Sequence, residues 1–185
     1  KAELHVHLEG TLDAAVLAEM DERVTAEEVE RRYQRGSFDH FIESFKWAVG
    51  HLRTPEHYAL AARRYFAKLA AQNVRYVEMT LAAGVVVWRK QEFAAVYEAV
   101  ARECERAPVE AWLVLDAVRQ FGVEHVEEVA RLAVERAGDR VVAFGIGGDE
   151  RHAPAGLLGG RFRLGRERGR ALVPHAGETM GASSV

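Results

Sequence analysis

The 185-residue chain contains a single cysteine, Cys104. One thiol excludes a disulfide framework and a zinc site built from cysteine thiolates, and we expect Cys104 to be a half-buried helical residue of a protein in a reducing compartment. The sequence also lacks a signal peptide and any run of ~18 or more apolar residues, so it predicts neither export nor a membrane span. These absences favour a cytoplasmic protein without a membrane partner.

Clustered positive charge is scarce as well. The chain has 25 Lys and Arg against 28 Asp and Glu, a net charge of −3 and a pI near 6.3, and the basic run that stands out is Arg161 to Arg170. Because binding to a phosphate backbone needs clustered Lys and Arg, we expect no nucleic-acid partner. Hydrophobic residues make up 49% of the chain, which is enough for a substantial core in a soluble globular protein.

Both ends of the sequence lack the features of a natural terminus. The chain begins at Lys1 without an initiator Met, directly on a segment of alternating apolar residues, and stops at Val185 just after a motif. A length of 185 residues fits one domain of roughly 100–200 residues or a piece of a larger one. We therefore expect residues 1–185 to be the N-terminal part of a single domain that is truncated at both ends.

Apolar segments typical of buried strands alternate with amphipathic segments typical of helices. The predicted strands are Ala2–Leu8, Val74–Leu81, Ala111–Val118, Val141–Ile146 and Ala171–Ala176. The predicted helices are Thr11–Met20, Ala26–Tyr33, Phe38–Leu52, Thr54–Gln72, Gln91–Arg106, Val123–Arg136 and the glycine-rich Ala155–Arg168. Thr11 and Thr54 are the predicted N-caps, and Pro55 suits a first helical turn. Apolar strands separated by helices predict a parallel sheet covered on its faces.

Two architectures fit this order, a doubly wound open sheet and a (β/α)8 barrel. The phosphate-binding glycine motif of dinucleotide folds is absent, because the first strand ends in Leu8-Glu9-Gly10. Reactive residue types fall instead at the carboxyl ends of the predicted strands, which is where barrel enzymes place their active sites. We therefore predict an α/β fold that is a partial (β/α)8 TIM barrel of about the first five strands.

Two histidines, His5 and His7, alternate in the first predicted strand with Leu4, Val6 and Leu8, which we expect to be buried. Residues i and i+2 of a strand project from the same face, so the two imidazoles should converge on one spot. Two neutral imidazoles are a ready chelate for a divalent metal, most commonly Zn²⁺. A strand histidine is more often a packed core residue, and for this pair alone the two alternatives stay equally open.

A third histidine, His175, ends the last predicted strand and is followed three residues later by Glu178. A third imidazole would give the three-ligand arrangement of catalytic zinc, which leaves one position open for water. Glu178, beside the metal but not bound to it, would serve as a general acid and base. The alternative is a helix N-terminus at which Glu178 interacts with the helix dipole and His175 only packs.

Glycines mark the end of the fourth predicted strand, in the segment Gly145–Glu150 (GIGGDE). Without side chains, the backbone there can approach a ligand closely and donate an N–H to a ring nitrogen. The competing interpretation is an ordinary glycine turn that carries two solvated acids. For this segment in isolation, the glycine turn is favoured.

Taken together, three segments resemble the adenosine deaminase family: KAELHVHLEG at Lys1–Gly10, GGDE at Gly147–Glu150 and HAGET at His175–Thr179. They occur in the order and rough spacing of that family, over essentially the whole chain, which would be about the first half of a family member. The resemblance implies a (β/α)8 barrel with one Zn²⁺ per active site. It also implies zinc-dependent hydrolytic deamination of a small-molecule partner, a 6-aminopurine nucleoside such as adenosine or a related adenine-bearing compound such as aminodeoxyfutalosine.

The same resemblance implies roles in catalysis for four residues. His5, His7 and His175 match the family's zinc ligands. Glu178 matches the residue that protonates purine N1 and assists the attack of water at C6. Further parts, a histidine that polarises the water and an Asp pair that includes a fourth zinc ligand, should follow Val185. The fragment alone is therefore expected to be inactive, and the activity to belong to the intact parent.

Substrate contacts are implied for Glu9, Gly148 and His7. Glu9 stands where the family often has an Asp that contacts the ribose, and the backbone of Gly148 matches one that faces the purine. A lid helix over the substrate is implied for Phe41, Ile42 and Phe45. Their helical spacing equally fits a core face. The departure of the residues before Gly148 from the more usual D-L-A-G pattern leaves the exact substrate open.

Two other classes of function compete with this interpretation. One is a different amidohydrolase that opens with H-x-H, and it is disfavoured because those enzymes bridge two metals with a Lys at the end of the fourth strand. The lysines here lie elsewhere, at Lys1, Lys46, Lys68 and Lys90. The other is a catalytically incompetent fragment or a non-catalytic interaction module.

Overall fold

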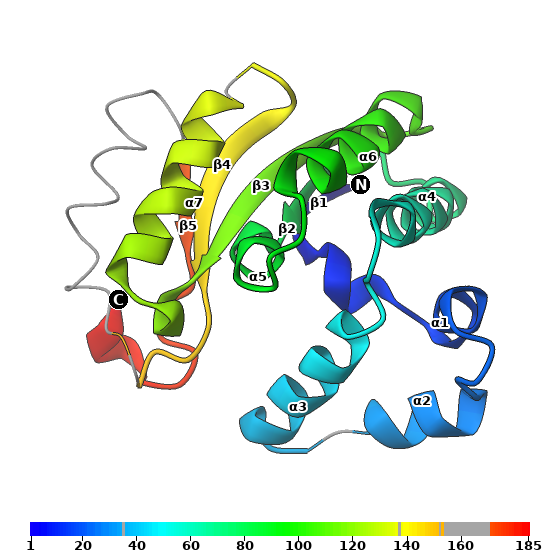
Figure 1. Ribbon diagram of the computed structural model, residues 1–185, viewed down its shortest axis with the longest axis horizontal. Coiled ribbons are helices and arrows are strands. Elements are labelled where there is room, and N and C mark those ends of the chain that lie inside the picture. Colours follow the sequence, from blue (N-terminus) through cyan, green and yellow to red (C-terminus); the bar gives the residue numbers. More distant parts are fainter. Residues whose placement is uncertain (35, 137, 152, 154–170) are drawn as a thin grey trace. The chain divides into compact units, whose positions relative to one another are not determined.

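The computed structural model describes residues 1–34, 36–136, 138–151, 153 and 171–185 (Figure 1). These residues form two compact units, Lys1–Val77 with Ala94–Glu110, and Glu78–Phe93 with Ala111–Val185. The predicted helix Ala155–Arg168 lies outside the described residues.

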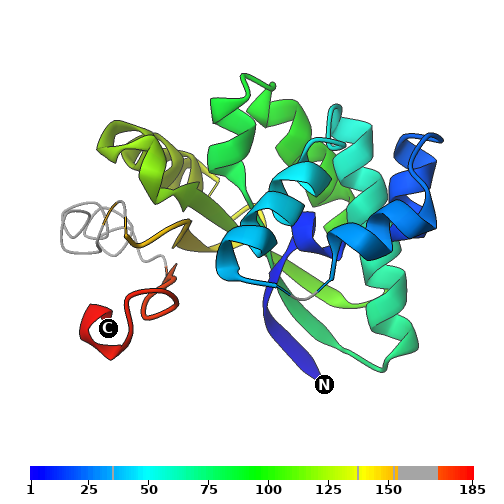
Figure 2. The same ribbon diagram turned by 90° about the horizontal axis from the view of Figure 1, so that it is seen from below.

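The first unit holds the N-terminal strand and a group of helices (Figure 2, blue to cyan). Its elements are β1 (Ala2–His7), the 3-10 turn η1 (Leu8–Thr11), α1 (Ala14–Met20), α2 (Ala26–Arg32), α3 (Phe38–Val49), α4 (Pro55–Ala71) and nearly all of α6 (Phe93–Arg106). Both α3 and α4 contact η1, and α1 contacts α2 and α4. Leu8, Leu12, Leu17 and Leu52 are fully buried and form the core beneath these helices.

Two sequence predictions near the start of the chain are wrong. Thr11 does not cap the first helix, because it ends η1, where its hydroxyl donates to the Leu8 carbonyl at 2.7 Å. Asp13 is the N-cap instead and accepts the Val16 N–H at 2.9 Å. Leu4 is not buried but 62% exposed, because β1 is an edge strand of the described sheet.

Among its described residues, the second unit contains the remaining strands and the helices α5 and α7 (Figure 1). Its elements are α5 (Ala83–Trp88), β3 (Glu110–Val118), the 3-10 turn η2 (Arg119–Phe121), α7 (Val123–Glu135), β4 (Val141–Gly147), β5 (Ala171–Pro174) and the short turn η4 (Ala182–Ser184). Strand β2 (Tyr76–Leu81) begins in the first unit and ends in this one. Helix α7 packs on β4, and β4 pairs in parallel with both β3 and β5.

The strand order decides between the two predicted architectures. The five strands follow one another as β1-β2-β3-β4-β5. Doubly wound sheets reverse direction at a switch point, so their strands never run in simple sequence order, whereas barrel strands do. The chain therefore has the fold of the first five strands of a (β/α)8 barrel, as the sequence predicted.

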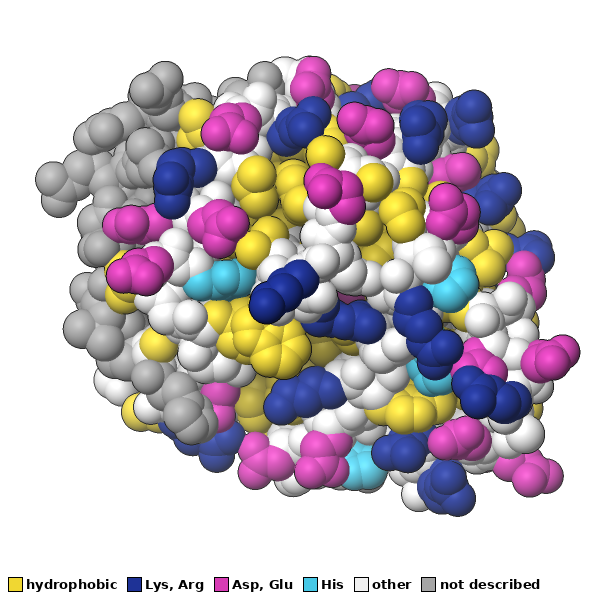
Figure 3. Space-filling model, viewed as in Figure 1, with side chains coloured by type: hydrophobic (Ala, Val, Ile, Leu, Met, Phe, Trp, Pro, Cys, Tyr) yellow, Lys and Arg dark blue, Asp and Glu magenta, His cyan; other side chains and the backbone are white. Residues whose placement is uncertain are grey.

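Two further expectations concern burial and charge. Cys104 is fully buried in α6 rather than half-buried. On the face drawn in Figure 3, acidic and basic side chains of the described residues are interspersed. Within the described part of the chain, no helix has both the length and the apolar character needed to cross a bilayer.

Candidate active site

His5 and His7 project from β1 as a pair. Their ring centroids lie 5.1 Å apart with the ring planes at 82°. His5 is exposed, and half-buried His7 has its ring edge-on to Phe45 of α3, at 6.3 Å between centroids. The strand geometry that the sequence predicted for the pair is therefore present, and an aromatic side chain of the proposed lid helix contacts one of its members.

His175 follows the last residue of β5, at the carboxyl edge of the sheet. The parallel register pairs Val118 of β3 with Gly147 of β4 and Ile146 of β4 with Pro174 of β5, so these strands end close together at this edge. The backbone of His175 continues this edge, because its N–H donates to the Ile146 carbonyl at 2.8 Å. Barrel enzymes assemble their chemistry at this edge.

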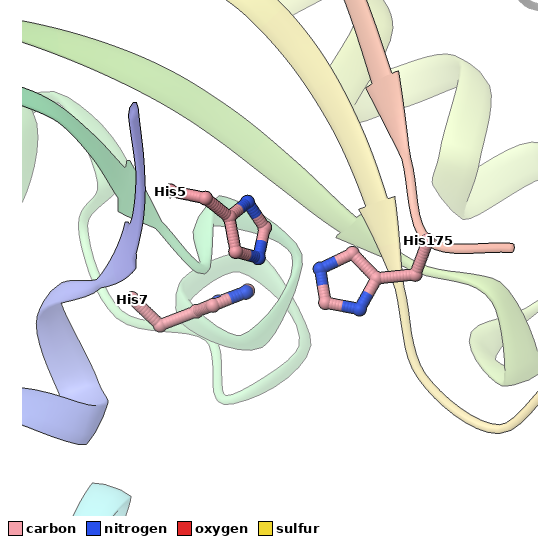
Figure 4. Close-up of side chains that lie close together, drawn as sticks. All are labelled: His5, His7 and His175. Atoms are coloured by element: carbon pink, nitrogen blue, oxygen red, sulfur yellow. The ribbon is translucent and has the colours of Figure 1, made fainter. Parts of the chain in front are cut away.

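The three predicted metal ligands come together in the structure (Figure 4). One ring nitrogen from each of His5, His7 and His175 lies within 4.8 Å of the other two. Glu178 lies beside this group rather than in it, with its Oε2 atom 3.4 Å from Nδ1 of His175. That contact occupies Nδ1 of His175 and leaves Nε2 as the nitrogen available to a metal.

Arg119 organises the carboxyl edge of the second unit, and the sequence patterns gave no signal for it. It is only 2% exposed, immediately after β3. Its guanidinium donates to three backbone carbonyls, those of Gly147 (Nε, 3.2 Å), His175 (Nη2, 2.5 Å) and Ala153 (Nη1, 3.4 Å). A planar guanidinium suits such a set of acceptors because its five N–H groups form a rigid fork.

Replacing Arg119 by Met is expected to lower the free energy of unfolding by about 3 kcal/mol, because buried carbonyls lose charged donors. Arg131→Met is the matched control, since Arg131 is exposed on α7, and its effect should stay within about 0.5 kcal/mol. Urea unfolding of the two variants measures the difference. Equal midpoints for both would show that the Arg119 hydrogen bonds do not support the edge.

The acids after β4 are buried, so the interpretation of this segment as a turn with solvated acids is wrong. Asp149 is 8% exposed and accepts both Nε and Nη2 of Arg151. Glu150 is 2% exposed and accepts four hydrogen bonds from residues 177–184. The Ser184 hydroxyl and the Thr179 N–H are the main causes that lower the pKa of Glu150 to about 2. The carboxylate is therefore ionised at neutral pH.

Glycines at the end of β4 admit a buried carboxylate. A Cβ atom at Gly145 would lie 2.6 Å from Oδ1 of Asp116, and one at Gly147 would lie 2.8 Å from Oδ2. Gly148 has a φ of 92°, and the side-chain oxygen of Gln120 occupies the place of its Cβ. At Gly145 and Gly147 the group that lies against the backbone is Asp116 of β3, so the predicted approach of a ligand to these glycines stays a prediction.

The remaining predicted residues lie in the first unit. Glu9 is 1% exposed, within η1. Helix α3 buries Ser44, Ala48 and Val49, whereas Phe41 is 54% exposed and Ile42 and Phe45 are half-buried. The aromatic face of α3 is thus outside the buried core, in contrast to the core-face alternative.

Comparisons with known proteins identify the family of the chain. Residues 1–185 match the sequence profile of the family described as adenosine deaminase. The chain belongs to the adenosine deaminase family. An adenine deaminase of Rhizobium johnstonii is 29% identical, and an aminodeoxyfutalosine deaminase of Streptomyces avermitilis is 31% identical; both alignments cover the whole chain.

The chain spans 60% of the length of the first relative and 55% of the second. Among solved structures, a zinc-bound amidohydrolase from Burkholderia ambifaria superposes with a TM-score of 0.83 at 24% identity, over 96% of this chain and 52% of that one. This likeness supports the barrel fold.

Proposed function

We propose that the protein is a zinc-dependent hydrolase that removes the 6-amino group from an adenine-bearing compound. The observation that carries the proposal is the group of three imidazole nitrogens within 4.8 Å of one another. Family membership and the names of the relatives support the deamination of a purine. The three histidines, with an acid beside His175, support metal-assisted hydrolysis as the class of reaction.

The donor set fits zinc. Neutral imidazoles suit this metal, and three of them with one open position are the ligand set of many catalytic zinc sites. His5, His7 and His175 would hold the metal. When bound, zinc lowers the pKa of a coordinated water to about 7.

Glu178 carries the proton chemistry in this proposal. Its carboxylate is exposed and lies beside His175, so a substrate above the three histidines can reach it. In its protonated form it donates to purine N1, and in its ionised form it takes a proton from the attacking water. One group can thus serve as acid and as base in a single turnover.

Substrate binding is assigned to Glu9, Gly148 and His7. Gly148 follows β4 at the carboxyl edge of the sheet, where its backbone can face a purine ring. Phe41, Ile42 and Phe45 form the proposed lid, and the ring contact between Phe45 and His7 supports this assignment. Exposed Phe41 gives the lid an apolar surface for an aromatic substrate.

The test is a substrate panel of adenine, adenosine and aminodeoxyfutalosine with the whole, zinc-loaded protein. We expect loss of absorbance in the adenine band and release of ammonia with at least one of the three. Turnover of adenine alone would assign a free-base deaminase, as named for the Rhizobium relative, and turnover of aminodeoxyfutalosine alone would follow the Streptomyces relative. Zinc-loaded protein that turns over none of them would overturn the proposal.

A further inference from the structure

Glu150 is a buried carboxylate, and its hydrogen bonds with described residues come from one short segment. Its Oε1 atom accepts the N–H of Gly177 at 2.8 Å and the hydroxyl of Ser184 at 2.6 Å. Its Oε2 atom accepts the N–H groups of Thr179 at 3.0 Å and Met180 at 3.3 Å. A carboxylate offers about four acceptor positions, so residues 177–184 use the full capacity of this one.

These bonds fix the backbone on both sides of Glu178. Its two neighbours, Gly177 and Thr179, both donate to Glu150. The Gly177 N–H also reaches the Ser184 hydroxyl oxygen at 3.0 Å, and Gly177 adopts a left-handed φ of 77°, which favours glycine. The backbone N–H groups of this segment therefore donate to the side chain of Glu150. In a strand or a helix they would donate to backbone carbonyls instead.

We propose that Glu150 is a positioning residue for the proposed proton carrier, holding the backbone around Glu178 so that its carboxylate stays beside His175. The inference rests on the proposed function. Proton transfer demands heavy-atom approaches of about 3 Å, and a misplacement of about 1 Å can cost ~10²-fold in rate. Because Glu178 is exposed, its direction depends on its backbone, and Glu150 sets that backbone.

The first test needs neither metal nor turnover. Glu150→Gln keeps the shape of the side chain but replaces one acceptor oxygen with an NH₂ group that cannot accept the facing N–H donors. We expect amide hydrogen exchange at Gly177, Thr179 and Met180 to become at least about tenfold faster, while the amides of β4 stay unchanged. Ser184→Ala removes a single donor and should give a smaller increase, about fivefold, at the same amides.

The second test uses the whole enzyme. Glu150→Gln should lower kcat about 10- to 100-fold while KM and zinc content stay close to those of the parent, because ligands and substrate contacts are retained. The kcat of Ser184→Ala should lie between that of the parent and that of Glu150→Gln. Glu124→Gln, an exposed acid in the first turn of α7, is the matched control and should leave kcat unchanged.

Several outcomes would overturn the positioning role. They are unchanged exchange at the three amides in both variants, full kcat in Glu150→Gln, or a loss of kcat that only follows a loss of zinc or of folded protein. Failure of the proposed function is distinguishable from these. A parent protein that deaminates no purine would refute the function, whereas the exchange experiment would still report whether Glu150 holds the segment.

Discussion

Replacement of His5 or His175 by Ala is expected to abolish stoichiometric zinc binding. The parent should bind about one zinc per chain, and each variant should bind it about 100-fold more weakly or worse, because loss of an outer partner alone costs 10- to 100-fold. His5 is the informative position, since it is exposed and its truncation leaves no cavity. Metal analysis after purification and competition with a chromogenic chelator measure the change.

The matched control is His57→Ala. His57 is a half-buried histidine at the start of α4, where its Nδ1 atom lies 2.8 Å from the His51 carbonyl oxygen, and it is not a member of the three-histidine group. It should keep the parent's affinity for zinc. If His5→Ala and His57→Ala bind zinc equally well, the three-histidine site is wrong. If neither the parent nor the control binds any metal, the assignment of a metalloenzyme fails.

The sequence predicted that the three histidines belong to one site because the position of each histidine on its strand follows from a local pattern. Alternation along β1 is enough to place His5 and His7 on one face, and the end of an apolar run is enough to place His175 at a strand terminus. Parallel strands bring their carboxyl ends to a common edge, so separate motifs could be assigned to one site from strand order alone.

The supporting groups around that site were beyond the reach of the sequence patterns. Arg119 and Glu150 bind mostly backbone atoms, and their partners after β5 lie 27–56 positions away in the chain. Every residue has a backbone carbonyl, and every residue except proline has a backbone N–H, so a hydrogen bond to the backbone cannot be recognised from residue types. A buried charged residue that binds the backbone is therefore indistinguishable in the sequence from a charged surface residue. The glycine-turn alternative interpreted Asp149 and Glu150 as solvated, and both are buried.

Local competition explains the other differences. Both Thr11 and Asp13 could cap the helix that follows, and the tight turn η1 used Thr11, leaving Asp13 as the cap. Helix α5 went unpredicted because its sequence AGVVVW is rich in β-branched residues, which favour strands when considered alone. Packing against α7 settles that segment as a helix.

Glu178→Gln is expected to lower kcat by about 10²–10⁴-fold, the usual contribution of a positioned acid or base, with zinc content unchanged. The amide is nearly isosteric with the carboxylate but can neither release nor take up the proton that purine N1 and water require. The backbone of the segment should be unaffected, because Gly177 and Thr179 still donate to Glu150. Steady-state kinetics on the best substrate of the panel, with metal analysis of the same samples, measure the effect.

Comparison of this variant with Glu150→Gln distinguishes the proposed proton transfer by Glu178 from the proposed positioning of Glu178 by Glu150. Glu178→Gln should leave amide exchange at Gly177 and Thr179 as in the parent and remove most of the activity, whereas Glu150→Gln should speed that exchange and remove less. If the kcat of Glu178→Gln falls by less than about tenfold, the loss is too small for the removal of a proton carrier. Another group would then have to carry the proton. Because Glu178 contacts His175 through Nδ1, a loss of zinc in this variant would instead identify it as a support for the metal ligand.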